Sequence, residues 1–222
     1  DVKMRDAASP VCVLTLDATR VLTGPALLDA DITGTDVTCF GADNGSIVIS
    51  NPTGGFGTYG YSINGGTTWQ GSGNFPNLAP GTYDVRIRDA AHITCVVQLD
   101  PAVVIAQPPI LSATVNSTNI TCFGSSDGTI TISGAAGGHG TYEYSINGGG
   151  SWQAAGNYTS LSPGTYNVQI RDAAYTGCYI ILNNALVLTQ PAVLKATITA
   201  TMITCNGAGE VIINITGPSG GY

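Results

Sequence analysis

The sequence predicts an all-β fold, a tandem array of immunoglobulin-like antiparallel β-sandwiches with a sequence period of 83. Three observations predict it: the composition, the internal repeat, and an alternation of apolar and polar residues. The 222 residues include 30 Gly and 11 Pro but only 14 acidic and 7 basic residues. A chain so rich in turn residues and so poor in strong helix formers favours many short strands over helices.

Identical residues recur along the chain at a fixed step of 83. The sequence Arg-Asp-Ala-Ala stands at 5–8, 88–91 and 171–174, and residues 78–91 match residues 161–174 at 11 of 14 positions. Two series of cysteines and one of prolines keep the same step: Cys12, Cys95 and Cys178; Cys39, Cys122 and Cys205; Pro25, Pro108 and Pro191. Copies this similar are expected to share one fold.

The period divides the chain into two full units and two partial ones. We expect full units at 26–108 and 109–191. The last strands of a preceding unit would lie at 1–25, and the first strands of a following unit at 192–222. The chain is then expected to be part of a longer array.

The first half of a unit predicts two strands and a hairpin. Residues 46–50 and 59–63 alternate apolar and polar side chains, with the period of a strand that has one buried face. Asn64-Gly65-Gly66 follows, and Asn and Gly tolerate the positive φ that tight hairpins need. We expect this hairpin to return the chain into a strand that contains Trp69, or Trp152 in the second unit.

The second half of a unit predicts a tyrosine corner and a long strand pair. A Pro-Gly turn lies just before Tyr83 in the alternating segment 81–89. Sandwich folds place a tyrosine at such a corner, so we expect the Tyr83 and Tyr166 hydroxyls to bond back to upstream backbone. The next strand contains Asp100-Pro101, where a bulge is needed because proline cannot donate to the ladder. The count is about seven strands in each unit.

The six cysteines are expected to form disulfides, which implies an oxidising compartment outside the cytoplasm. Their spacings alternate between 27 and 56, unlike the close pairs of zinc sites. Two pairings fit the repeat: Cys39 with Cys95 and Cys122 with Cys178 inside each unit, or Cys39 with Cys178 between consecutive units. In an immunoglobulin-like order, Cys39 and Cys95 lie at opposite ends of one sandwich, whereas Cys178 lies at the near end of the next. This favours Cys39 with Cys178, and free buried thiols are the remaining alternative.

Several function classes are not supported by the sequence. The net charge of −7 provides no basic patch for nucleic acid, and no apolar run reaches the roughly 20 residues of a membrane span. His92 aligns with Tyr175 and His139 with Phe56, so the two units share no histidine position. The acidic residues fall mainly in turns. We therefore expect no catalytic residues and no cofactor.

Two further sets of side chains have a structural and a ligand-binding interpretation. Asp43, Asn44 and Asp127 carry oxygen atoms of the kind that bind calcium, but Asp and Asn before Gly are also what a tight turn needs. Trp69 and Trp152 could stack on sugars, but aromatic residues also stabilise sheets by packing across strands. In both cases the pattern favours the structural role.

Five motifs together resemble one known family, the SprB-type repeat of large surface adhesins of gliding Bacteroidota. These motifs are V-T-C-F-G with D-N-G-S-I at 37–47, then Y-S-I-N-G-G, then L-x-P-G-T-Y-x-V-x-I-R-D, then a Cys, then Q-P. Thr94 departs from the Gly that the family has before the last Cys, and the third copy at 205–209 is two residues shorter before its strand. The resemblance implies type IX secretion, display as surface filaments for adhesion or gliding, and contact with extracellular polysaccharide. It implies no catalytic residue.

The leading hypothesis is therefore a structural repeat segment of a secreted cell-surface filament or adhesin. Its partners would be neighbouring repeats of the same chain, extracellular polysaccharide, or other copies in a fibre. The alternative is an array of carbohydrate-binding sandwich modules, including modules accessory to a secreted enzyme. An exposed Trp69 coplanar with a Tyr would favour sugar binding, and burial of both Trp69 and Trp152 would favour the stalk.

Overall fold

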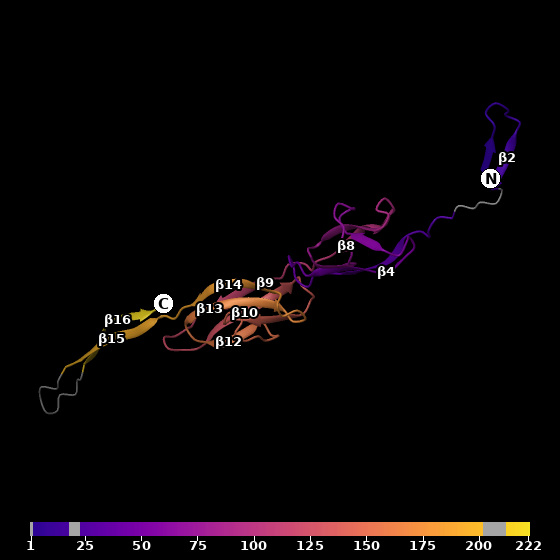
Figure 1. Ribbon diagram of the computed structural model, residues 1–222. Coiled ribbons are helices and arrows are strands. Elements are labelled where there is room, and N and C mark those ends of the chain that lie inside the picture. The colour runs from indigo at the N-terminus through magenta and orange to yellow at the C-terminus, as the bar shows by residue number, and fades with distance from the viewer. Residues whose placement is uncertain (1, 18–22, 202–211) are drawn as a thin grey trace. The chain divides into compact units, whose positions relative to one another are not determined.

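The computed structural model describes residues 2–17, 23–201 and 212–222 (Figure 1). Every regular element in this part of the chain is a β-strand, and none of it forms a helix that could cross a membrane. The residues group into two compact units. One comprises Asp1–Thr35 with Gly45–Ile105, and the other comprises Asp36–Asn44 with Ala106–Tyr222. The segment between residues 36 and 44 thus belongs to the second unit.

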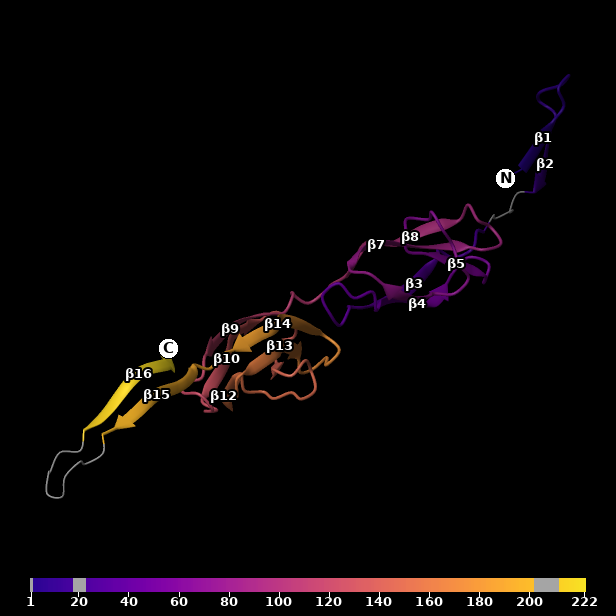
Figure 2. The same ribbon diagram turned by 90° about the vertical axis from the view of Figure 1, so that its left-hand side faces the viewer.

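The first unit is a sandwich of two three-stranded antiparallel sheets, preceded by a hairpin. The sheet orders are β3-β4-β6 and β5-β7-β8, and Figure 2 shows β8 in one layer with β3 and β4 in the other. These orders correspond to strands A-B-E and C-F-G of an immunoglobulin domain. The strands are β1 (Val2–Arg5), β2 (Val13–Asp17), β3 (Asp29–Thr35), β4 (Gly45–Thr53), β5 (Tyr59–Ser62), β6 (Asn74–Leu78), β7 (Gly81–Asp89) and β8 (Val96–Ile105).

The second unit contains the same sandwich, followed by a hairpin. Its sheet orders are β9-β10-β12 and β11-β13-β14, and each of these strands begins at the residue that the repeat aligns with the start of its counterpart, as Ser112 aligns with Asp29. The strands are β9 (Ser112–Thr118), β10 (Gly128–Ala136), β11 (Tyr142–Ser145), β12 (Asn157–Leu161), β13 (Gly164–Asp172), β14 (Tyr179–Leu188), β15 (Ala192–Ala200) and β16 (Ile213–Gly221). The all-β sandwich expected from the sequence is confirmed.

The core of the second sandwich forms where inward side chains of its two sheets meet. Ile130 and Ile132 of β10 and Val168 and Ile170 of β13 are buried in one cluster, at the positions that the alternation predicts. Each contributes about 1.5–3 kcal/mol by leaving water. Gly128, at the start of β10, leaves space for this core, because a Cβ there would lie 3.1 Å from Leu188 Cδ1.

Each copy contains six named strands, not about seven, and Trp69 and Trp152 lie in none of them. The missing strand is the D strand of the immunoglobulin order. Between β5 and β6 the chain forms only isolated bridges, from Gln70 to Tyr61 and from Asn64 to Asp84. The Asn64 side chain instead closes this loop locally, because its Oδ1 accepts from Thr68 N at 3.0 Å. The tight turn predicted at Asn64-Gly65-Gly66 is present, with positive φ at both glycines. The strand predicted to follow it and to contain Trp69 is absent.

Two details of the second half of each unit agree with the expectation. The Tyr83 hydroxyl donates to the Ala79 carbonyl at 2.8 Å, and the Tyr166 hydroxyl donates to the Ser162 carbonyl at 2.8 Å. The pairing of β7 with β8 shifts register at Asp100, as a strand containing Asp-Pro requires.

Tyr158 provides a test of the second core, because the first unit has Phe75 at the same position. The Tyr158 hydroxyl donates to the Tyr144 carbonyl at 2.7 Å, and burial raises the pKa of Tyr158 to about 12. Its stabilising contribution is therefore complete below pH 10 and is lost as the pH rises towards 12. Tyr158→Phe should lower the free energy of unfolding by about 1 kcal/mol at neutral pH.

The measurement is urea unfolding of the wild type and of Tyr158→Phe at pH 7 and at pH 11. The wild type should lose more stability between the two pH values than the variant does. An equal loss in both proteins would show that folding does not raise the pKa of Tyr158. Phe75→Tyr, which adds a hydroxyl at the matched position, is the control.

Candidate functional site

The loop between β3 and β4, residues 36–44, carries Cys39 and is held at its first two residues. Asp36 Oδ1 accepts from Ala106 N at 2.7 Å, and Val37 N donates to the Ala106 carbonyl at 3.1 Å. Val37 is buried, with 2% of its surface exposed. The loop thus leaves its strand along the segment that follows β8.

Short polar side chains then close the loop around Cys39. Asn44 Oδ1 accepts from Thr38 N at 3.0 Å, and Asn44 Nδ2 donates to Thr38 Oγ1 at 2.7 Å. Gly41, whose φ of +72° favours glycine, donates its N–H to Gln107 Oε1 at 2.8 Å. These bonds hold the loop closed around Cys39.

The opposing cysteine, Cys178, lies in the turn between β13 and β14. Asp172 closes this turn: its carboxylate accepts from Ala174 N at 2.8 Å and Tyr175 N at 3.2 Å. It also accepts from the backbone N–H of His139, in the loop between β10 and β11. The carboxylate therefore ties two loops together at one end of the sandwich.

Asp172 is fully buried, yet it stays ionised at neutral pH. Burial alone would raise the pKa of its carboxyl, but the amide hydrogen bonds from His139, Ala174 and Tyr175 outweigh burial and lower the pKa below its ordinary value. Asp89 does the same in the first unit, with amides of Phe56, Ala91 and His92.

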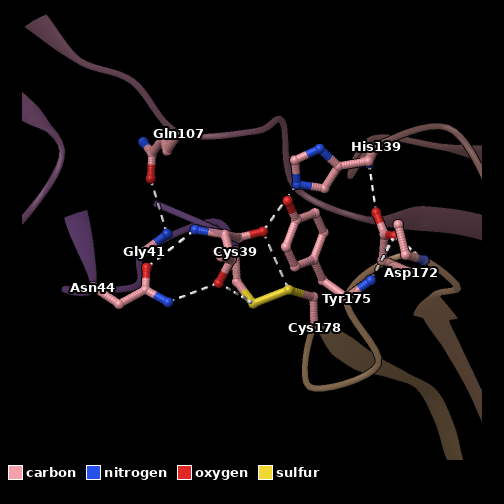
Figure 3. The surroundings of a disulfide bond; sticks show 10 residues. Cys39, Gly41, Asn44, Gln107, His139, Asp172, Tyr175 and Cys178 are labelled. Atoms are coloured by element: carbon pink, nitrogen blue, oxygen red, sulfur yellow. Dashed lines mark hydrogen bonds between the residues drawn. A yellow bond between two sulfur atoms is a disulfide. The ribbon is translucent and has the colours of Figure 1, made fainter. Parts of the chain in front are cut away.

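Cys39 and Cys178 form a disulfide, with their Cα atoms 5.4 Å apart and 139 residues apart in sequence (Figure 3). Beside it, His139 Nε2 lies 3.0 Å from the Thr38 carbonyl oxygen, and the His139 ring packs on Tyr175 with centroids 4.4 Å apart. Cys178 Sγ lies 3.3 Å from the same carbonyl, but this is a contact only, because a disulfide sulfur carries no proton.

A small apolar cavity surrounds the disulfide. Thr38, Cys39 and Phe40 line one side of it, and residues 108–111, Gly138 and 178–180 line the other. The loop of residues 36–44 thus fills a hollow between the segment before β9 and the turn before β14. We call this arrangement the junction.

Most of the junction recurs one repeat later in the sequence, around Cys122. Asn119 Oδ1 accepts from Thr189 N at 3.0 Å, and Gly124 N donates to Gln190 Oε1 at 2.9 Å. The Tyr222 hydroxyl, at the position that matches His139, donates to the Ile120 carbonyl. Thr121, Cys122 and Phe123 line a cavity with residues 191–194, Gly221 and Tyr222.

The remaining cysteines are placed as follows. Cys12, Cys95 and Cys122 are free and exposed, and Cys205 lies outside the described residues. Of the two pairings considered, the structure contains the one between consecutive repeats of the sequence, and both of its cysteines lie in the second compact unit. Pairing of Cys39 with Cys95 and of Cys122 with Cys178 is absent, because Cys39 and Cys178 are joined to each other.

The candidate calcium residues serve as turn residues in this structure. Asn44 closes the first loop, and Asp127 accepts from Thr121 N at 3.0 Å in the second. The hydrogen bonds from the Thr121 side chain and backbone lower the pKa of Asp127 below its ordinary value. Asp43 is exposed. Within the described ranges, no group of three or more His, Cys, Asp or Glu side chains is placed to hold a metal ion.

The two tryptophans are half-buried. They are neither fully exposed, as sugar binding would favour, nor fully buried, as a stalk would favour. A guanidinium covers each ring, Arg88 at 4.5 Å from the Trp69 centroid and Arg171 at 4.4 Å from that of Trp152. Each indole N–H is used within its own turn, as Trp69 Nε1 donates to the Gly66 carbonyl at 2.8 Å. Arg171 is itself held by Glu143 at 2.6 Å.

Sequence reasoning missed a pair of rings that both units share. Phe56 packs on His92 with centroids 4.2 Å apart, and His139 packs on Tyr175 in the same way. The histidine has exchanged places with the other ring between the two units. Taken one position at a time, the histidines do not align. Each of the two positions holds His in one unit and another aromatic residue in the other unit. This exchange was the signal in the sequence that the two side chains are in contact.

The role of Asp172 predicts the effect of Asp172→Asn. The variant should lose charge-assisted hydrogen bonds to the amides of two loops, so the thermal midpoint at pH 7 should fall by about 5 °C or more. Because the folded-state pKa is lowered, the wild type should lose this advantage as the pH falls below about 4. The Cys39–Cys178 bond should also re-form more slowly after reduction.

The check is calorimetry at pH 7 and pH 3, with thiol counting during reoxidation. Asp89→Asn is the matched control, since it makes the same change beside the free Cys95. It should lower the stability of the first unit and leave reoxidation of Cys39 with Cys178 at the wild-type rate. Equal reoxidation rates for Asp172→Asn and Asp89→Asn would contradict the assigned role.

Comparison with known proteins gives one finding. The model of the SprB repeat family matches residues 32–68 and 114–151. Each match starts in the first strand of a sandwich and ends one residue before the tryptophan of its loop. A search of curated proteins found no significant match, and neither did a search of solved structures. The family is a structural repeat of cell-surface proteins and not an enzyme family. The chain therefore carries SprB repeats at these two places.

Proposed function

We propose that this chain is a structural segment of a secreted cell-surface filament or adhesin, in which disulfides join each repeat to the next. The single observation that carries the proposal is the Cys39–Cys178 bond. It joins two cysteines from different copies of the repeat across a sequence separation of 139. A bond that only stabilised one sandwich would not need to reach the next copy.

The position of the bond in the chain suggests how a pulling force would be carried. Force applied at the two ends of the chain would pass from Cys39 directly to Cys178 through the disulfide. The backbone between them, which includes the strands from β4 to β13, would then not lie on the covalent path of the force. In the chain-entropy model, closing a loop this long also stabilises the folded state by about 5 kcal/mol. Both effects suit a protein that works under tension outside the cell.

The titratable groups at the junction are engaged in maintaining it. Asp172 is used by three backbone amides, and His139 Nε2 lies within hydrogen-bond distance of the Thr38 carbonyl. A general base or nucleophile needs a free atom that faces a substrate. This use of the charged groups supports a structural role over a catalytic one.

Adhesion or gliding as the cellular task, type IX secretion as the route and an extracellular location are parts of the same proposal. They rest on the SprB repeats and on the preference of disulfides for oxidising compartments. Contact with extracellular polysaccharide and association of chains into fibres fit such a filament. A carbohydrate-binding array is less well supported, because the arginines cover one face of each tryptophan and the turns use the indole N–H groups.

Single-molecule stretching of the chain between its two ends tests the load path. With the disulfide intact, the chain between the two cysteines, which are separated by 139 in sequence, cannot extend. At about 3.3–3.6 Å per residue, the final contour length should be roughly 480 Å shorter than that of Cys39→Ser. Adding a reductant to the wild type should recover that length.

Cys122→Ser is the matched control, because Cys122 occupies the position of Cys39 in the next copy and is free. It should extend like the wild type. The proposed load path is wrong if the oxidised wild type extends as far as Cys39→Ser does.

A further inference from the structure

The first unit contains a second copy of the junction cavity, at Cys95. Among the residues that line it, 25–28, Gly55 and 95–97 each align by the repeat with a residue that lines the cavity at Cys178. Phe56, Asp89 and Thr94 also line it. The residues at Cys178 that have no such counterpart are Thr38, Cys39 and Phe40, which belong to the inserted loop. The cavity at Cys95 thus has the walls of the junction without the loop.

This cavity is already organised as its counterpart is. Asp89 accepts from the amides of Phe56, Ala91 and His92, as Asp172 does at the other site. The rings of Phe56 and His92 pack 4.2 Å apart. Cys95 N donates to the His92 carbonyl at 2.8 Å, and Cys178 N donates to Tyr175 in the same way. The turn that presents Cys95 therefore has the conformation of the one that presents Cys178.

The cavity also offers the right chemistry for the loop that fills its counterpart. Cys95 is exposed and free, and Leu27 is an apolar wall residue with 78% of its surface exposed. The inserted loop supplies a cysteine and, next to it, Phe40. A thiol beside an exposed apolar wall matches a Cys-Phe pair in both respects.

We propose that the cavity at Cys95 is a docking site for a Thr-Cys-Phe-Gly loop of a further SprB-type repeat, which it binds and then joins by a disulfide to Cys95. The inference rests on the proposed function, and it deepens that function by naming the partner of this end of the first unit. The loop of residues 36–44 and its seat around Cys178 are the occupied example of the same site.

The covalent step is thiol–disulfide exchange. The Cys95 thiol loses its proton to solvent, and the thiolate attacks the sulfur of a mixed disulfide on the loop cysteine. The new Cys95–Cys bond forms as the old sulfur–sulfur bond breaks, and the leaving thiolate departs with the electron pair. The mixed disulfide supplies the oxidising equivalent. A thiol oxidant outside the cell would form this mixed disulfide on the loop cysteine.

The chain itself contains the control for this site. Cys12 follows the same Arg-Asp-Ala-Ala turn as Cys95, and Asp6 Oδ1 accepts from Ala8 N at 2.7 Å, as Asp89 does from Ala91 N. The hollow at Cys12 is lined only by residues 4–6 and 12–14 of the hairpin. Cys12 thus has the turn of a docking site without its wall.

The experiment uses the intact, oxidised chain and a synthetic peptide of residues 36–45 whose cysteine carries a 2-thiopyridyl disulfide. Labelling of Cys12, Cys95 and Cys122 is followed over time by mass spectrometry of the digest. Docking should make Cys95 react about tenfold faster than Cys12 or Cys122, because it raises the local concentration of the disulfide. A peptide with Ser in place of Phe40 should lose this advantage, and so should the exposed wall variant Leu27→Glu.

The outcomes separate this inference from the proposed function. The same digest contains the Cys39–Cys178 peptide pair. If that pair is present and Cys95 reacts no faster than Cys12, the docking site is wrong and the proposed function stands. If that pair is absent, the occupied example is lost and both fail. A rate at Cys95 that is unchanged by the Phe40 and Leu27 substitutions also overturns the docking site.

Discussion

The buried carboxylate of Asp172 is the interaction on which the junction depends. One side chain satisfies amides in two loops that are 33 residues apart in sequence, and so it holds His139 and the turn of Cys178 at the same end of the sandwich. Because the core of the sandwich lies between the sheets, side-chain hydrogen bonds of this kind order its loops. The ionised carboxylate stabilises loop backbone that would otherwise lose hydrogen bonds to water on folding.

Given ordered loops, the disulfide follows from the repeat. Each copy has one cysteine in the loop after its first strand and one in the turn before its last strand, and these lie at opposite ends of the sandwich. A cysteine of one copy can therefore meet its partner only in another copy, and Cys39 meets Cys178. The Asn44, Gln107 and Asp36 bonds hold the loop of Cys39 in the orientation in which it meets Cys178. The repeat therefore provides both the sandwich fold and the cysteines that join one copy to another.

The sequence predicted those parts of the fold that depend on local patterns. Alternation identified the inward positions of Ile130 and Ile170, and the Pro-Gly-Thr-Tyr turn identified the Tyr83 corner. The missing D strand was not predicted, because the Asn64 side chain bonds within the loop and competes with strand pairing. The pairing of His139 with Tyr175 and the burial of Asp172 were also missed. Both depend on which loops meet in space. The alternation of apolar and polar residues within one strand does not show which loops meet.

The most direct test of the account is a proteolytic map of the chain without reductant, read by mass spectrometry. The account predicts a peptide pair that joins Cys39 to Cys178, with Cys12, Cys95 and Cys122 recovered as thiols in the isolated chain. Recovery of Cys39 joined to Cys95, together with Cys122 joined to Cys178, would contradict it. The disulfides would then close each repeat on itself, and the repeats would be linked only through the polypeptide backbone.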